Sequence, residues 1–229
     1  MKAFVVDLDS SENQSILKPI ARPFNNQAHQ VNEAAEKIHE LIKNAPYSND
    51  NIVLKRNEIK EAFFSPFKPQ LKNTQVFLSH SHADKNKALE VKDYLESQTK
   101  RKVFIDSLFW DYKDDVLNKL AKHDDISKIE DAFTLILRES LQDVIEKCPY
   151  FVFLQSKNSV SNQGLSRNQD LLKITYSAWI YEELKIAHSI SESRPIPMME
   201  SMQVFHDISP FLESFETITL KKLSQQINS

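Results

Sequence analysis

The sequence predicts an α/β fold, a parallel β-sheet with helices on both of its faces. Short apolar runs have the composition of buried parallel strands, and they alternate with segments that show the apolar repeat of amphipathic helices. The expected strands are Gln75–Ser79, Lys102–Ile105 and Tyr150–Leu154. The expected helices are Lys85–Ser97, Ala132–Cys148 and Tyr176–Ile190. This alternation favours adjacent parallel strands in one sheet, with their carboxyl ends at one edge.

The segments around these elements complete the expected domain. Pro195–Met199 is expected to be a fourth strand. Asp111–Ile129 is charged and weakly periodic, so we expect an exposed insertion there, and Asn158–Thr175 is a second insertion. In parallel sheets the ligand crevice lies beyond the carboxyl ends of the strands. The expected site is therefore formed by Ser79–Asp84, Asp106–Asp111 and Ser156–Asn162.

Residues 1–71 are interpreted as a mostly helical N-terminal extension of a domain that covers residues 72–229. Lys2–Leu8 contains the β-prone residues of a strand. Apolar residues at helical spacing predict a helix over Gln27–Lys43, and Arg56–Phe64 is expected to be a shorter helix. We expect the first of these helices to pack its apolar face on the domain or on another copy of the chain.

Composition excludes several classes of protein. The chain has 229 residues, is 41% hydrophobic and carries a net charge of −3 with its cations dispersed, so nucleic acid is not an expected partner. Cys148 is the only cysteine, which rules out an internal disulfide and a cysteine-based zinc site. The apolar runs are much shorter than the about 20 residues that span a bilayer, and the N-terminus does not resemble a signal peptide. No membrane association and a cytoplasmic location are therefore expected.

Glycine is almost absent from the chain. Gly164 is the only one, so neither a G-x-G-x-x-G dinucleotide turn nor a P-loop can be present. A bound nucleotide would have to be held without a glycine-rich phosphate loop.

Four motifs occur in the order typical of one protein family. They read VFLSHSHAD at Val76–Asp84, VFIDS at Val103–Ser107, FVFLQS at Phe151–Ser156 and SAWIYEEL at Ser177–Leu184. Together they resemble the TIR (Toll/interleukin-1 receptor) family over about half of the chain, from Thr74 to Ile190. The resemblance implies a flavodoxin-like parallel sheet.

The resemblance also implies an activity. In enzymatic TIR domains, a glutamate four residues after the helix tryptophan is required to break the bond between nicotinamide and ribose in NAD+; the matching residue is Glu183. Nicotinamide is a good leaving group, so one carboxylate beside the ribose, where positive charge develops, is sufficient. Trp179 lies one turn earlier on the same face and can stack on a flat ring. The alternative is that Glu183 is a solvated surface residue, which is our expectation for Glu182.

Further substrate-binding residues are expected at the strand ends, where side chains can replace glycine amides as donors to phosphate and ribose oxygens. Together with Trp179, the candidates are Ser79, His80, Ser81, Asp84, Asp106 and Trp110. The alternative for this segment is a helix N-cap, with Ser81 or His82 ahead of the helix and Asp84 in its first turn. No metal is expected, because His80 and His82 have no visible third ligand.

The resemblance thus implies an NAD+-cleaving TIR enzyme of the kind found in bacterial antiphage systems such as Thoeris. NAD+ is its substrate, no cofactor is implied, and the product is an ADP-ribose-type signal, cyclic, linear or conjugated, for a separate effector protein. Self-association is also implied. The main alternative is a non-enzymatic TIR adaptor that acts by self-association; Glu183 argues against it, because adaptors commonly lack this residue.

A second alternative comes from the N-terminus. FVVDLDSS at Phe4–Ser11 loosely matches the D-x-D-x-S/T strand end of haloacid-dehalogenase phosphatases, with Asp7 as the nucleophile. The later lysine and the acidic pair in a glycine-containing turn that this family needs do not follow. We therefore expect Asp7 and Asp9 to be dispensable for activity.

Overall fold

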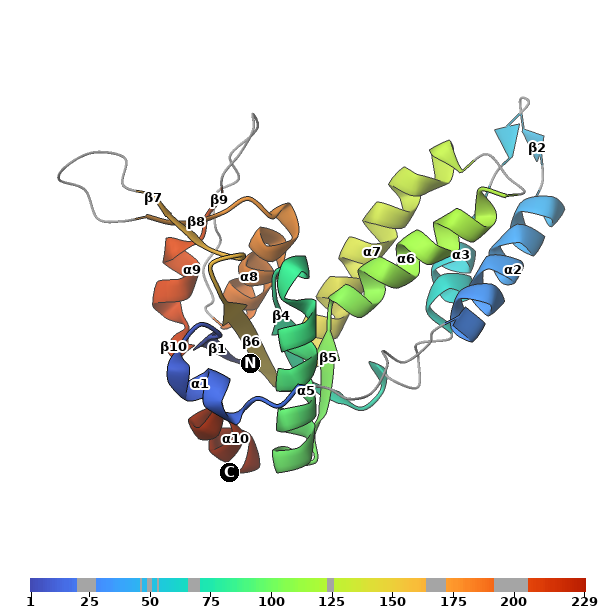
Figure 1. Cartoon of the computed structure of the whole chain (residues 1–229). Helices are drawn as coiled ribbons and strands as arrows, with labels where there is room; N and C mark the ends of the chain where they lie inside the picture. The colour runs from blue at the N-terminus through green and yellow to red at the C-terminus, as the bar shows by residue number, and fades with distance from the viewer. Residues whose placement is uncertain are drawn as a thin grey trace. The chain divides into compact units, whose positions relative to one another are not determined.

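The computed structural model describes residues 1–19, 28–45, 47–48, 51–52, 54–65, 71–122, 126–163, 172–191 and 206–229. The strand expected at Pro195–Met199 lies outside these residues. The chain divides into two compact units (Figure 1). Unit 1 consists of Met1–Ala21, Thr74–Asp106 and Gln142–Ser229, and unit 2 of Arg22–Asn73 and Ser107–Leu141.

Unit 1 is built around a five-stranded sheet in which each described strand runs parallel to its neighbours. Across the sheet the order is β10 (Glu216–Thr217), β1 (Lys2–Asp7), β6 (Tyr150–Gln155), β4 (Thr74–Ser79) and β5 (Lys102–Ile105). The three strands expected from their apolar runs are therefore neighbours. This confirms the α/β class and the parallel sheet.

The inner strands are apolar because a parallel sheet covered by helices buries both of its faces. Val76, Phe77 and Leu78 of β4 are fully buried, as is Phe151 of β6. The rings of Phe77 and Phe151 stack with their centroids 5.7 Å apart. This packing fixes β4 and β6 side by side and places their carboxyl ends at a common edge.

β1 is an integral strand of this sheet and not part of a separate extension. It pairs with β6 along its whole length, from Lys2 opposite Tyr150 to Asp7 opposite Gln155. On its other side β1 pairs with β10. The two compact units therefore differ from the division expected at residue 71, because the hydrogen bonds of β1 tie the start of the chain to unit 1.

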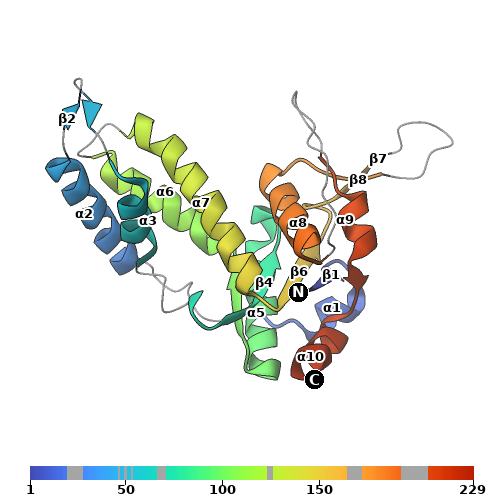
Figure 2. The same cartoon turned by 180° about the vertical axis from the view of Figure 1, so that it is seen from behind.

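Helices flank the sheet of unit 1. α5 (Lys85–Thr99) and α10 (Leu220–Asn228) lie side by side on one face, and α8 (Ala178–Ser191) packs on β1 and β4 from the other (Figures 1 and 2). The shorter helices of the unit are α1 (Ser11–Ile16), the 3-10 helix η2 (His82–Asp84) and α9 (Ser209–Ser214). In the described part of the chain, no helix combines the length and the apolar character needed to cross a membrane.

A small antiparallel sheet occupies part of the insertion expected after β6. β7 (Ser161–Gln163) pairs with β8 (Leu172–Thr175), and β8 pairs with β9 (His206–Asp207). β8 leads directly into α8, where the Ser177 hydroxyl accepts a hydrogen bond from the Ile180 N–H at 3.3 Å. This contact caps the helix and fixes its start two residues after the predicted position.

Unit 2 has a core of its own. Its elements are α2 (Ala28–Asn44), the antiparallel pair β2 (Tyr47–Ser48) and β3 (Asn51–Ile52), α3 (Arg56–Phe64), α6 (Ser107–Leu120) and most of α7 (Ser127–Lys147). Phe63 is fully buried, and its ring lies 4.9 Å from that of Tyr112 and 5.0 Å from that of Phe133. The Tyr112 hydroxyl donates a hydrogen bond to the Phe63 carbonyl at 2.8 Å.

The exposed insertion expected at Asp111–Ile129 is wrong for most of its length, because α6 runs to Leu120. Tyr112, Val116 and Leu120 are buried at the spacing of one helix face. Asp114 and Asp115 between them are exposed. These charges on the outer face conceal the apolar period in the sequence.

Candidate functional site

Two neighbouring strands of unit 1 end in polar residues. β4 ends at Ser79 and is followed by His80, and β5 is followed by Asp106. Because Leu78 pairs with Ile105, these polar residues emerge at the same edge of the sheet. All three are buried. The carboxyl edge of a parallel sheet is where such folds bind their ligands, so this group is a candidate site.

His80 and Asp106 form a buried ion pair. His80 Nδ1 lies 2.7 Å from Asp106 Oδ1, and the two side chains are 0% and 6% exposed. Burial alone would lower the pKa of the imidazole, but the charge of Asp106, together with that of Asp84, raises it above its ordinary value. The charges of the two aspartates therefore favour the protonated form of His80 more than in a free histidine.

Glu183 lies on the inner face of α8. Ile180, Leu184 and Ala187 are its neighbours at helical spacing, and all three are buried. Glu183 itself is 0% exposed. The helix repeat therefore directs this carboxyl into the interior of unit 1, and the surface alternative for Glu183 does not apply.

The carboxyl of Glu183 interacts with both strand ends. Burial raises the pKa of Glu183 well above its usual range, the nearby Asp106 raises it further, and contact with the Ser79 hydroxyl partly opposes the shift. Neither carboxyl oxygen makes a hydrogen bond of regular geometry within the described residues. Such buried polar atoms are rare in folded proteins and often mark functional sites. We call Ser79, His80, Asp106 and Glu183 the Glu183 cluster.

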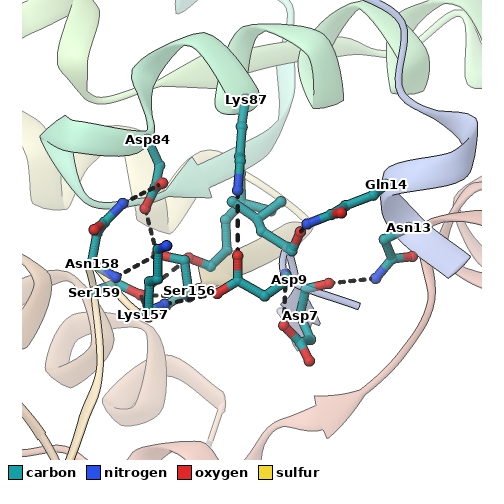
Figure 3. Close-up of polar contacts among 12 residues, drawn as sticks. Asp7, Asp9, Asn13, Gln14, Asp84, Lys87, Ser156, Lys157, Asn158 and Ser159 are labelled. Atoms are coloured by element: carbon teal, nitrogen blue, oxygen red, sulfur yellow. Dashed lines mark hydrogen bonds and ion pairs between the residues drawn. The ribbon is translucent and has the colours of Figure 1, made fainter. Parts of the chain in front are cut away.

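Asp84 connects this edge of the sheet to the loop after β6. Its carboxylate accepts hydrogen bonds from the Ser156 hydroxyl and, at 2.9 Å, from the side-chain amide of Asn158 (Figure 3). The Asn158 N–H also donates to the Ser156 hydroxyl at 3.0 Å. Ser81 is the N-cap residue of η2 and Asp84 lies in its first turn, as the N-cap alternative expects, but neither side chain makes a capping hydrogen bond. Asp84 instead holds the β6 loop beside η2.

A second set of contacts connects the end of β1 to the same loop (Figure 3). Asp9 accepts a hydrogen bond from the Lys157 N–H at 2.9 Å and forms an ion pair with Lys87 of α5 at 3.3 Å. The Lys157 hydrogen bond, with help from Lys87, lowers the pKa of Asp9. Asp7 accepts a hydrogen bond from the Asp9 N–H at 2.8 Å. Both aspartates thus take part in local structural contacts.

Five of the predicted site residues lie in one region of unit 1: His80 contacts Asp106 directly, Asp84 acts on His80 electrostatically, and Ser79 and Asp106 influence the pKa of Glu183. Ser81 is half-buried, and its carbonyl accepts a hydrogen bond from the Asp84 N–H at 2.8 Å. Trp179 is half-buried on α8, one turn before Glu183. Trp110 lies in α6 of unit 2, and its side chain is outside the described part of the structure. Among the described residues, no group of three His, Cys, Asp or Glu side chains is placed to hold a metal ion.

Sequence reasoning missed two residues that shape this region. Asn158 lies in the expected Ser156–Asn162 segment, so its position after a strand was a usable signal. Lys87 lies in the first turn of α5 and has no local signal, since its partner Asp9 is far away in the sequence. Long-range pairs of this kind depend on the fold and cannot be read from local patterns.

Comparison of the chain with protein-family models, with curated proteins and with solved structures finds no match. The sequence motifs and the geometry of the Glu183 cluster are therefore the observations that bear on function.

Proposed function

We propose that the chain is an NAD+-cleaving enzyme of the TIR type with Glu183 as its catalytic residue. The observation that carries the proposal is the place of Glu183, which matches the motif and is fully buried beside Ser79 and Asp106. Ser79 ends β4, Asp106 follows β5 and Glu183 lies on α8, so the three residues come from separate parts of the chain to the carboxyl edge of a parallel sheet. The ordered TIR-like motifs supply the reaction class.

The proposed reaction breaks the bond between the nicotinamide nitrogen and the ribose. The bonding electron pair leaves with nicotinamide, which becomes neutral, and positive charge passes to the ribose. A carboxylate beside the ribose stabilises this charge, and water or a hydroxyl of the same ADP-ribose then attacks the ribose carbon and loses a proton. The electrostatic effect is strong in a buried site because little water screens it.

Access to the carboxyl requires a rearrangement. Glu183 is 0% exposed, so a substrate reaches it only after neighbouring groups move. Self-association or binding of a trigger would supply this opening. In the proposed biological context the released ADP-ribose-type product, cyclic or linear, is a signal in bacterial antiphage immunity that a separate effector protein receives.

The test is nicotinamide release from NAD+ by the full chain, assayed at high protein concentration to favour self-association. Glu183→Gln keeps the size of the side chain and removes its charge, so the rate should fall by about 10²–10³, as for the loss of one electrostatic stabiliser. Glu182→Gln is the matched control and should retain most of the activity, because Glu182 lies about 100° around the helix. Equal rates for wild type and Glu183→Gln would rule out this mechanism.

The two alternatives give different outcomes in the same experiment. If the wild type self-associates but releases no nicotinamide under any condition, the adaptor function replaces the enzymatic one.

Asp7→Asn tests the phosphatase alternative. We expect unchanged NAD+ cleavage, because Asp7 is exposed and its carboxylate accepts a hydrogen bond from the Asp9 N–H. Loss of turnover with the fold intact would support the phosphatase instead.

A further inference from the structure

Glu183 lies in surroundings that oppose a negative charge. α8 packs on β1, β4, β8 and α9, and its face around Glu183 is apolar. The charged side chains on these elements point to solvent: Lys2 and Asp7 on β1, Lys173 on β8 and Glu213 on α9. On α8 itself, Glu182 and Lys185 are half-buried and His188 lies 2.8 Å from the Ser214 hydroxyl. Asp106 acts directly on the Glu183 carboxyl, and it is an acid too.

The one basic side chain of the Glu183 cluster is His80, and Asp106 already lies beside it as an acidic partner. The imidazole of His80 lies 2.7 Å from the carboxylate of Asp106, and both side chains are almost completely buried. The negative charge of Asp84 also attracts the protonated imidazole. When His80 is protonated, it forms a pair with Asp106 that has no net charge, so it leaves no positive charge for Glu183. A negative charge on Glu183 would be buried without a partner, which is strongly unfavourable.

We propose that Glu183 holds a proton while the site is empty and releases it to solvent when a ligand with a cationic pyridinium ring docks beside it. This inference rests on the proposed function and deepens it, since it names the property of the substrate that the site selects. The ring supplies the positive charge that the cluster lacks. One cation enters as one proton leaves, so the net charge of the buried site is conserved. The carboxylate needed for bond cleavage is thus created by the substrate itself.

The charge exchange has a measurable consequence. When binding releases one proton, the affinity rises about tenfold for each unit of pH, as long as the free protein holds that proton. A ligand of the same shape with a neutral ring causes no such release. The reduced dihydropyridine form of the dinucleotide has this property, because it differs from the oxidised form by the charge of the ring.

The probe is a carbocyclic analogue of NAD+ in which a methylene group replaces the ring oxygen of the nicotinamide ribose. It keeps the cationic ring but cannot form the stabilised ribosyl cation, so it binds without being cleaved. The reduced form of the same analogue is the matched control. Calorimetric titration of the full-length wild type in two buffers of different ionisation enthalpy counts the protons released. Repeating the titration about one pH unit higher gives the change in affinity.

We expect about one proton released and about tenfold tighter binding per pH unit for the cationic analogue, and neither effect for the reduced analogue. Glu183→Gln should bind the cationic analogue without proton release. Binding of the cationic analogue by the wild type without proton release would overturn this inference and leave the proposed function standing. Equal release with both analogues would overturn it as well. Failure of both analogues to bind would overturn the proposed function together with the inference.

Discussion

At the scale of the residue, Glu183 occupies a position that helix geometry assigns to an apolar side chain. Ile180, Leu184 and Ala187 fill the surrounding positions of the same helix face. Folded proteins break such local rules mainly at functional sites, where stability is given up for chemistry. The carboxyl of Glu183 is therefore expected to weaken the fold that surrounds it.

Because the buried carboxyl of Glu183 weakens the fold, the effect of Glu183→Gln on the free energy of unfolding should depend on pH. Burial and the neighbouring Asp106 raise the folded-state pKa of Glu183 above its ordinary 4.5. A group with a raised folded pKa stabilises the fold below its unfolded pKa, and this contribution is lost as the pH rises through the folded pKa. The stability of Glu183→Gln relative to wild type, measured by urea unfolding, should therefore increase as the pH rises above 4.5. Glu182→Gln should show no such trend, and a difference independent of pH would contradict the expectation.

The sequence predicted Glu183 as a site residue from its spacing to Trp179, but it did not predict how the surroundings of Glu183 are paired. The burial of its side chain is a finding of the structure. His80 and Asp106 were each predicted as substrate contacts, but their ion pair was not. It arises from the register that sets Leu78 opposite Ile105, and this register is a property of the assembled sheet.

At the scale of the element, local composition predicted where the strands lie in the sequence better than it predicted which strands pair with each other. β1 was expected as a strand because Phe4, Val5 and Val6 are β-prone, and it is one. Its neighbours β6 and β10 follow much later in the chain, so its place inside the sheet was not predictable from the segment itself. α6 shows the opposite problem, since its acidic outer face hides an apolar period that only the packed helix reveals.

The place of β1 in the sheet predicts that its core residues are essential for folding. Phe4 is 1% exposed between β6 and β10, so Phe4→Ala should lower the free energy of unfolding by about 3–5 kcal/mol. Lys2→Ala on the same strand removes an exposed side chain and should change it by less than about 0.5 kcal/mol. Urea unfolding of both variants provides the measurement. A similarly small effect for Phe4→Ala would show that β1 is dispensable.

At the scale of the whole molecule, the chain builds two cores from interleaved segments. The sheet and its helices form unit 1, and the aromatic group around Phe63 lies in unit 2. The chain passes from unit 1 to unit 2 and back twice, so sequence order alone does not show the division. The single boundary expected at residue 71 differs from this interleaved division.

Because each unit has its own core, a cavity made by substitution in one core should lower hydrogen-exchange protection in that unit alone. Phe63→Ala removes a fully buried ring from unit 2 and should cost about 3–5 kcal/mol there. Hydrogen exchange should then speed up in α2, α3 and α6 while the amides of β4 and β6 keep their protection, because the lost contacts belong to unit 2. Phe77→Ala in β4 is the reciprocal variant and should give the opposite pattern. A uniform loss of protection in both variants would show that the units unfold as one.

The long separation between β1 and β6 also affects how the protein folds while it is being made. Lys2–Asp7 leaves the ribosome well before its partner Tyr150–Gln155 has been synthesised. At about 5–20 residues per second, the apolar segment around Phe4 waits on the order of ten seconds for the strand it pairs with. An unpaired apolar strand can associate with other chains during this time. We therefore expect the nascent chain to need a chaperone that shields its first strand until β6 emerges.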